Sequence, residues 1–356
     1  MPYDITIVGA GPAGSTLARL LDKRYKVLLL DRRDLIDGEN EKRMKCCGGL
    51  LAPDAQQMLG KMGLAVPTDV LVDPQLFLVR TIDFDNFQER FYQRFYFNMD
   101  RKRFDEWLVS LIPENVAMAM GCRFNSLSEN KEGYDIAFMY NNKIYTEKTK
   151  VIVGADGAWS SVRKQLFGEK DTLKKYITIQ EWFETDEAVP YYGAIFDSEI
   201  TDFYSWTISK NGQLIIGSAL APEKDAQQKF ESLKNNLREY GFSFNKRVRR
   251  EGAYLLRPRK GDILTGNDHA ALVGEAGGFI SPSSAEGISY ALRSAHALAL
   301  SLNEGVEDFQ KRYRKSIVNL RSNIALKQLK SPAMYNKTLR GLVMKSGLLS
   351  SKVLFE

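Results

Sequence analysis

The sequence predicts an α/β fold, in which a nucleotide-binding lobe with a parallel sheet carries an inserted antiparallel β-sheet and C-terminal helices. Three observations support this prediction. The first 31 residues have the pattern strand, glycine turn, helix, strand. Short aromatic segments between residues 176 and 220, separated by Asn-Gly and acidic turns, are typical of an antiparallel sheet. The last 50 residues have the spacing of basic amphipathic helices.

The individual elements follow from local patterns. The first helix has an apolar face of Ala13, Leu17, Leu20 and Leu21, and Asp100 is placed as the N-cap of a later helix. Pro332 is expected to interrupt the helices at the C-terminus. Strands are predicted at 3–8, 27–30, 91–97, 135–140, 151–153 and 270–273, and helices over 224–240 and from about 285 to 302.

These elements divide the chain into three parts. A discontinuous cofactor-binding lobe is expected to comprise 1–75, 98–172 and 258–305. The β-rich lobe, which we expect to hold the substrate, comprises 76–97 and 173–257, and a basic helical segment comprises 306–356. The chain has 356 residues and 44% hydrophobic content, which is enough for two lobes that share a ligand.

The first glycine turn has the features of a dinucleotide-binding site. Gly9, Gly11 and Gly14 form a G-x-G-x-x-G that includes Pro12 and Ala13, follows a strand and opens a helix. The first glycine permits the tight turn, the second lets a pyrophosphate approach the backbone, and the third lets helix and strand pack closely. Asp31, at the end of the second strand, is placed to accept hydrogen bonds from the adenosine ribose. This motif alone does not distinguish an NAD-binding site from an FAD-binding site.

Two later segments again place an acid after a buried strand and before a helix. One is 154–163, with Asp156 between glycines, and the other is 274–287, with Glu275 after Gly274. In their order and spacing, the three segments resemble the p-hydroxybenzoate hydroxylase-like FAD fold. The resemblance implies that a helix beginning near Ser284 points its N-terminus at the flavin N1–C2=O edge, where reduced flavin carries negative charge.

That resemblance implies non-covalent FAD and assigns roles to single residues. Asp156 would lie near FAD and the nicotinamide donor, and Glu275 would hold the ribityl chain where Asp is usual. Arg101, in 100–105, would face the pyrophosphate; a solvated basic turn is the alternative. The predicted cofactor contacts are Gly9, Gly11, Pro12, Ala13, Gly14, Asp31, Arg32, Cys47, Gly48, Gly49, Arg101, Asp156, Gly274, Glu275, Gly278, Phe279, Gly287 and Ile288.

A narrower resemblance concerns the reaction. The segment 45–51, which contains Cys47, Gly48 and Gly49, resembles the Cys-Gly-Gly segment of the geranylgeranyl reductase family. The segment 204–209, with Gly217 downstream, resembles that family's Y-x-W-x-F-P motif, although Ile and Ser replace the last two residues. The CbrA-type bacterial branch looks most similar. The family resemblance implies reduction of a C=C bond in a prenyl chain by hydride from flavin N5, with Cys47, Tyr204 and Trp206 as catalytic candidates.

Several alternatives stay open. Trp206 is either an aromatic wall for an apolar substrate or an ordinary core residue, and Cys47 is either a reactive thiol or a small buried hydrophobe. A monooxygenase or a halogenase that acts on an aromatic substrate would share the FAD segments. A flavin-binding protein without catalytic activity would share them too. Because the chain has a single dinucleotide fingerprint, NAD(P)H or a redox protein is expected as a transient electron donor.

Composition bears on disulfides, metal sites, cellular location and partners. Cys46, Cys47 and Cys122 form no disulfide framework, and two histidines without a C-x-x-C predict no metal site. No signal sequence is recognisable, so a cytoplasmic location is expected. The segment 306–356 has a net charge of +8. It either packs on the cofactor lobe or makes a peripheral contact with the inner membrane surface, and no nucleic-acid partner is expected.

Overall fold

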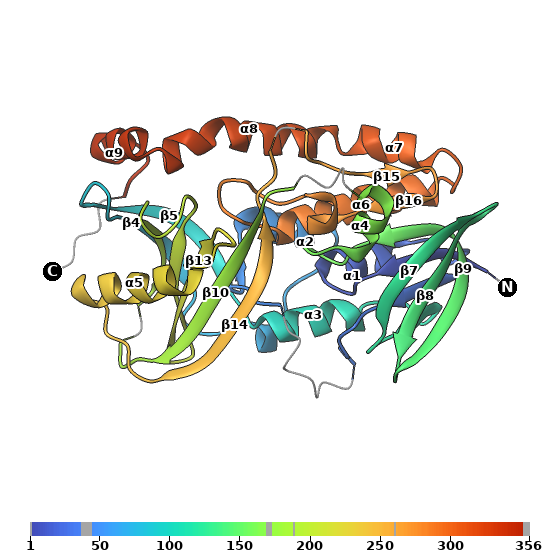
Figure 1. Ribbon diagram of the computed structural model, residues 1–356, viewed down its shortest axis with the longest axis horizontal. Coiled ribbons are helices and arrows are strands. Elements are labelled where there is room, and N and C mark those ends of the chain that lie inside the picture. Colours follow the sequence, from blue (N-terminus) through green and yellow to red (C-terminus); the bar gives the residue numbers. More distant parts are fainter. Residues whose placement is uncertain (1, 37–44, 169–172, 188, 260, 352–356) are drawn as a thin grey trace.

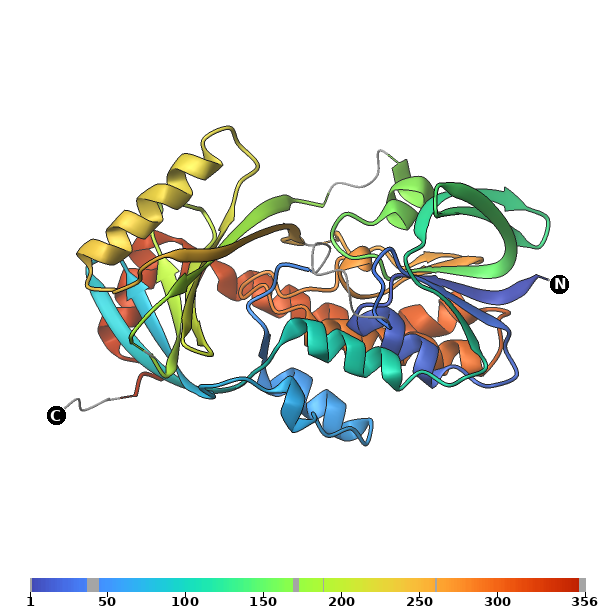
Figure 2. The same ribbon diagram turned by 90° about the horizontal axis from the view of Figure 1, so that it is seen from below.

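The computed structural model describes residues 2–36, 45–168, 173–187, 189–259 and 261–351, and these fold into two lobes. Each lobe is built on an eight-stranded sheet. The sheets lie side by side along the long axis, and the C-terminal helices run along one side of both (Figures 1 and 2).

The first sheet is largely parallel and positions the three glycine segments. Its central path is β15-β16-β9-β1-β2-β6, and β7 and β8 extend it as an antiparallel hairpin next to β9. The carboxyl ends of β1, β9 and β16 lie at one edge, because β1 pairs in parallel with β9, and β9 with β16. The strands are β1 (Tyr3–Val8), β2 (Val27–Leu30), β6 (Val116–Ala119), β7 (Arg123–Asn130), β8 (Gly133–Tyr140), β9 (Lys143–Gly154), β15 (Gly266–Asn267) and β16 (Ala270–Leu272).

Helices cover this sheet and bury its apolar residues. α1 (Pro12–Leu20) packs against α6 (Ile288–Asn303) and contacts α3 (Arg101–Ser110), and α2 (Pro53–Lys61) also packs on α6. The short helix α4 (Ser161–Phe167) follows β9, and the 3-10 turn η4 (Gly274–Gly277) follows β16. Asp100 caps α3 as expected, since its side chain accepts a hydrogen bond from the Arg103 N–H.

The second sheet forms the other lobe. Its order is β14-β10-β13-β12-β11-β4-β5-β3, and it is antiparallel except where β11 pairs in parallel with β4. The helix α5 (Ala226–Glu239) packs on it. The strands are β3 (Leu50–Leu51), β4 (Leu76–Asp83), β5 (Gln88–Asn98), β10 (Lys175–Glu184), β11 (Tyr191–Phe196), β12 (Ser205–Lys210), β13 (Gln213–Leu220) and β14 (Arg247–Leu256).

The predicted helix over 224–240 is α5, which is shorter by two residues at its start and one at its end. Larger differences concern α6 and the C-terminal helices. The helix expected from about residue 285 begins at Ile288, because Ala285 has a φ of 53°, which no right-handed helix accommodates. The C-terminal helices are α7 (Phe309–Ser316), α8 (Val318–Tyr335) and α9 (Lys337–Ser346). Pro332 does not interrupt them: α8 continues to Tyr335, and the break falls at Asn336, whose side chain accepts from the Leu339 N–H and caps α9.

Candidate functional site

The turn after β1 has the geometry that a pyrophosphate needs. Gly9 has a φ of 108°, and a Cβ there would lie 2.5 Å from the Ala155 carbonyl oxygen. A Cβ on Gly14 would lie 1.7 Å from the Gly9 oxygen, so both glycines are required by the fold itself. Gly11 differs, because the nearest atom to its Cβ position is Arg33 Nη2 at 3.9 Å. Gly11 also starts α1 with no side-chain cap among the described residues, so the helix N-terminus is open to an anion.

Asp31 lies beside this turn, but its carboxylate is already fully bonded. Oδ2 accepts from the Ala10 N–H at 2.6 Å and from Arg33 Nη2 at 3.1 Å. Oδ1 accepts from the Arg33 N–H at 2.8 Å and from Arg33 Nε at 3.1 Å. Four donors fill the acceptor sites of a carboxylate. An adenosine ribose would therefore bond to Asp31 only after the Arg33 side chain moves.

Arg33 links this acid to α3 through a buried ion-pair cluster. Arg33 Nη1 donates to Asp105 Oδ2 at 2.8 Å, and Arg101 Nε donates to Asp105 Oδ1 at 2.8 Å. Burial alone would raise the pKa of the Asp105 carboxyl, but the charges of Arg101 and Arg33 hold that pKa below its usual value. Sequence reasoning named Arg32, whose side chain is exposed, and missed its buried neighbour.

Asp156 and Glu275 both lie at the shared strand edge and both have partners within the chain. Asp156 accepts from Ser160 Oγ at 2.5 Å and from the Ser161 N–H at 2.7 Å, so it holds the first turn of α4. Burial raises the pKa of Asp156. Glu275 accepts from Lys45 Nζ at 2.5 Å and from the Leu256 N–H at 3.0 Å. Glu275 thus joins the segment before Cys47 to the end of β14.

The loop between η4 and α6 contains the remaining predicted cofactor contacts. Gly274 and Gly278 have positive φ values of 57° and 82°, and Phe279 is fully buried in the core of the first lobe. Gly287 precedes α6, which starts at Ile288 with no side-chain cap among the described residues. In the next position the Ser289 hydroxyl is buried and has no hydrogen-bond partner in the described part of the chain. The free N–H groups of an uncapped helix start and an unpaired hydroxyl can both form hydrogen bonds with the polar edge of a ligand.

A buried cluster of aromatic side chains, which we call the aromatic wall, packs beside this loop. Tyr204 donates its hydroxyl to the Ser284 carbonyl oxygen at 2.7 Å, and Trp206 Nε1 donates to Gln180 Oε1 at 3.2 Å. Both rings are buried, and their centroids lie 5.8 Å apart. A Cβ on Gly217 would lie 2.2 Å from the Trp206 indole, so the glycine makes room for that ring. The wall also contains Tyr96, Tyr192, Phe196, Phe203 and, from α8, Tyr335.

Cys47 lies between this wall and the cofactor lobe. Its carbonyl oxygen is 3.4 Å from Gln180 Nε2, and its thiol accepts from the Gly49 N–H at 3.4 Å. The thiol is also within electrostatic range of the buried Arg101 and Lys210. The next residue, Gly48, faces Ile208 of β12, where a Cβ would lie 2.6 Å from Ile208 Cδ1. The segment containing Cys47 thus packs against β12 of the second sheet.

Lys210, at the end of β12, is a residue that sequence reasoning missed. Its Nζ donates to the Met99 oxygen at 2.6 Å and to the Gly49 oxygen at 3.0 Å. A lysine beside an Asn-Gly turn has the sequence appearance of a solvated residue, yet this side chain is buried. Burial lowers the pKa of Lys210 to about 7, and the influence of Cys47 and Asp100 opposes that shift. Lys210 therefore ties the Cys47 segment to the residue before the α3 cap.

Lys210 should make stability depend on pH above neutrality. Its folded pKa lies below its unfolded value, so the unfolded chain binds more protons between about pH 7 and pH 10. The free energy of unfolding should rise by up to about 2 kcal/mol between pH 7 and pH 9, and Lys210→Met should remove this rise. Urea unfolding of both proteins at the two pH values measures it. An identical pH dependence in the variant would contradict the assignment.

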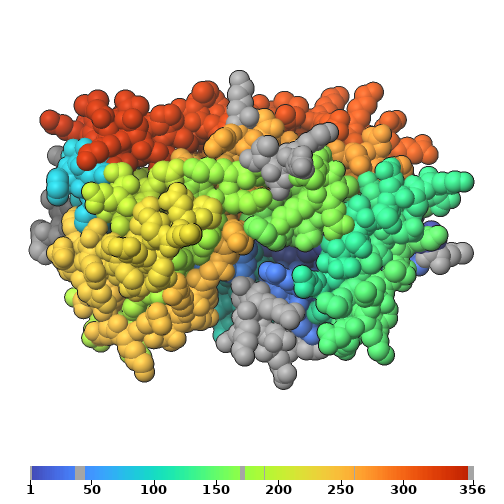
Figure 3. Space-filling view, in the orientation of Figure 1, coloured from blue at the N-terminus to red at the C-terminus, as the bar shows by residue number. Residues whose placement is uncertain are grey.

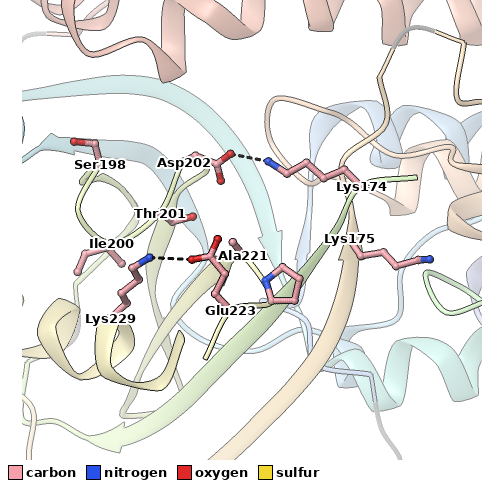
Figure 4. Close-up of a pocket in the computed structure, with 10 residues that line it drawn as sticks. Lys174, Lys175, Ser198, Ile200, Thr201, Asp202, Ala221, Glu223 and Lys229 are labelled. Carbon is pink, nitrogen blue, oxygen red and sulfur yellow. Dashed lines mark hydrogen bonds and ion pairs between the residues drawn. The ribbon is translucent and has the colours of Figure 1, made fainter. Parts of the chain in front are cut away.

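The molecular surface shows two kinds of hollow. One lies between the lobes, with N-terminal atoms at its floor (Figure 3). The other, of about 530 Å³, is lined only by residues of the second lobe and includes none of the predicted site residues. Ion pairs of Lys174 with Asp202 and of Lys229 with Glu223 span its lining (Figure 4).

Comparisons with known proteins agree with this geometry. Residues 7–39 match the family model of the NAD(P)-binding Rossmann-like domain. The fold is similar to a geranylgeranyl bacteriochlorophyll reductase-like protein from Thermoplasma acidophilum, with a TM-score of 0.81, 18% identity and coverage of 99% of this chain and 92% of that one. It is also similar to pqsL, a probable FAD-dependent monooxygenase from Pseudomonas aeruginosa, with a TM-score of 0.70, 15% identity and coverage of 97% and 99%.

These structural likenesses establish the flavoprotein oxidoreductase fold. Sequence similarity is more specific. The chain is 41% identical over 347 residues to Protein CbrA of Escherichia coli O6:H1. The aligned region covers 97% of this chain and 94% of that protein. With that identity across nearly the full length of both proteins, the chain belongs to the CbrA family.

Proposed function

We propose that this protein is an FAD-dependent reductase of the geranylgeranyl reductase type, which reduces C=C bonds of an apolar, prenyl-like substrate. The observation that carries the proposal is the aromatic wall of the second sheet, which is hydrogen-bonded through Tyr204 to the loop before α6. A wall of this kind excludes water and suits an elongated apolar chain.

The described residues fit FAD. Gly11 leaves room for a pyrophosphate at the N-terminus of α1, and the uncapped start of α6 with the unused Ser289 hydroxyl suits the flavin edge. Arg101 donates to Asp105 through Nε. It would reach the phosphates either with its other N–H groups or after this bond is exchanged. When bound and reduced, FAD would supply the hydride for the double bond.

The chain's own residues would supply the rest of the reaction. Saturating a C=C bond takes a proton as well as a hydride, and the Cys47 thiol is our candidate donor because it lies between the wall and the cofactor lobe. The Tyr204 and Trp206 donors are already bonded to Ser284 and Gln180, so we assign both residues to substrate positioning. The electron donor would be NAD(P)H or a redox protein in the cytoplasm.

Flavin reoxidation tests the proposal. Reduced enzyme, kept without oxygen, should be reoxidised by a prenyl lipid, and the product should be two mass units heavier per saturated bond. Turnover only with oxygen and a phenol would assign a monooxygenase instead, and turnover with halide and an indole would assign a halogenase. If none of these substrates reoxidises the flavin, the protein binds flavin without catalysing any of these reactions.

Gly217→Ala should separate substrate positioning from cofactor binding. The new Cβ would meet the Trp206 indole at 2.2 Å, so the ring must move. We expect a roughly 10- to 100-fold lower rate with the prenyl substrate and an unchanged flavin content. Gly60→Ala in α2 is the control, because its Cβ meets nothing within 4 Å. An unchanged rate in Gly217→Ala would mean that Trp206 does not position the substrate.

A further inference from the structure

The outer side of the C-terminal helices carries a large apolar surface. In α9, Leu339, Leu342 and Val343 are 45%, 61% and 40% exposed, and they follow the i, i+3, i+4 spacing of a single helix face. Leu348 and Leu349, just after α9, are 65% and 85% exposed. On α8, Leu326 and Leu329 are 56% and 78% exposed. A helix at a protein surface normally buries such a stripe.

The docked face of α9 combines a buried ion pair with an apolar contact. Arg340, Gly341 and Met344 are its buried residues. Arg340 donates to both carboxylate oxygens of Asp83, at 2.8 and 2.9 Å, and also pairs with Asp85. A bidentate buried ion pair therefore fixes the helix with its leucines turned outward. Leu339, Leu342 and Val343 therefore lie on the exposed side of α9.

A distant segment adds an aromatic side chain to the same surface. Phe87, at the turn between β4 and β5, is 94% exposed and has a φ of 51°. The turn contacts α9 directly, since Asn86 Nδ2 donates to the Lys337 carbonyl oxygen at 2.9 Å. In Figure 1 this turn lies next to α9 at one end of the molecule. We define the tip surface as Phe87, Leu339, Leu342, Val343, Leu348 and Leu349.

The charged residues of α8 and α9 are all basic. From 318 to 351 the sequence has six Lys and Arg residues and no Asp or Glu. Lys327 and Lys337 face Glu286 and Asp85 at 4.0 and 3.9 Å, whereas Lys330 and Lys345 are exposed at the surface. Leucines and a phenylalanine flanked by cations match an anionic bilayer, whose headgroups pair with lysines while its acyl region takes up the apolar side chains.

We infer that the tip surface docks this protein on an anionic lipid membrane as a peripheral contact. None of the described helices is long and apolar enough to span a bilayer. The contact would resemble that of interfacial helices, which bind by apolar insertion and by charge together. The inference concerns the surface alone and does not depend on the reaction proposed above.

Vesicle co-sedimentation of the full chain tests the inference. The protein should pellet with vesicles of equimolar phosphatidylcholine and phosphatidylglycerol at low salt, and much less with pure phosphatidylcholine or at high salt. Two variants should each weaken binding at least about tenfold: Phe87→Asn/Leu339→Gln/Leu342→Gln and Lys330→Gln/Lys345→Gln. Asn suits position 87 because it tolerates a positive φ.

A matched control changes exposed residues at the opposite end of the molecule. Ile144, Lys143 and Lys148 on β9 are exposed, so Ile144→Thr/Lys143→Gln/Lys148→Gln should bind like the parent. Negligible pelleting under all conditions, or equal binding by all variants, would overturn the inference. So would a concentration-dependent dimer that the apolar variant abolishes, because the tip surface would then belong to a second copy of the chain.

Discussion

Replacing Gly11 with Val should abolish flavin binding while the fold stays intact. The Cβ position of Gly11 has free space around it, with Arg33 Nη2 as the nearest atom at 3.9 Å, so the side chain fits the protein without cofactor. It occupies the space through which a pyrophosphate would approach the α1 backbone. The purified variant should be colourless, and its free energy of unfolding without cofactor should change by less than about 1 kcal/mol.

Gly14→Ala is the comparison variant, because it should destabilise the fold itself. Its Cβ would meet the Gly9 oxygen at 1.7 Å, so the chain must shift even when no cofactor is present. We expect a loss of about 1–3 kcal/mol in the free energy of unfolding of the cofactor-free protein. Stoichiometric FAD in purified Gly11→Val would refute the placement of the pyrophosphate at this turn.

Removing the Asp105 carboxylate should cause the largest loss of stability. Asp105 is fully buried and accepts hydrogen bonds from both Arg33 and Arg101, so Asp105→Ala leaves two buried guanidinium groups without their shared partner. Breaking a buried ion pair in this way costs about 3–5 kcal/mol. Urea unfolding of the cofactor-free protein measures it. A loss below about 1 kcal/mol would show that the cluster is not a stabilising contact.

Glu106→Ala is the matched control on the same helix. Glu106 lies 3.8 Å from Lys102 in a partly exposed pair, whose removal should cost at most about 1 kcal/mol. Acid should bring the stabilities of the two variants closer together. The folded pKa of Asp105 lies below its ordinary value, so its contribution is complete above about pH 4 and is lost as the pH falls through the folded pKa. The difference between the parent and Asp105→Ala should therefore shrink only below about pH 4.

Local patterns were sufficient to predict the first two strands and the N-cap of α3. β1 and β2 have the predicted bounds, and Asp100 caps α3 as predicted, because apolar runs, glycine spacing and a capping side chain act within a few residues. The resemblance to FAD folds then predicted that distant glycine segments meet. The parallel register of β1, β9 and β16 shows how they do so.

The residues that the sequence did not indicate act through contacts between distant segments. Lys210 is buried where it bonds to Gly49 and Met99, and Lys45 bonds to Glu275, so both contacts depend on how segments far apart in the sequence pack together. The start of α6 was placed too early because alanine favours helices, whereas the loop forces Ala285 to a positive φ. No local pattern carries that information.

The position of β9 between β1 and β16 has a consequence for biosynthesis. β1 can pair with β2 as soon as both have left the ribosome, and β8 can pair with β9 from Lys143 to Thr149. The last residues of β9, from Ile152 to Gly154, lack a partner on that side until residues near Ala270 are translated. The three glycine segments meet only after that strand is added, so a nascent chain holds no complete cofactor site for most of its synthesis. Until then the apolar edge of β9 is open to pairing with other chains, and strains that translate this message slowly should depend more strongly on chaperones.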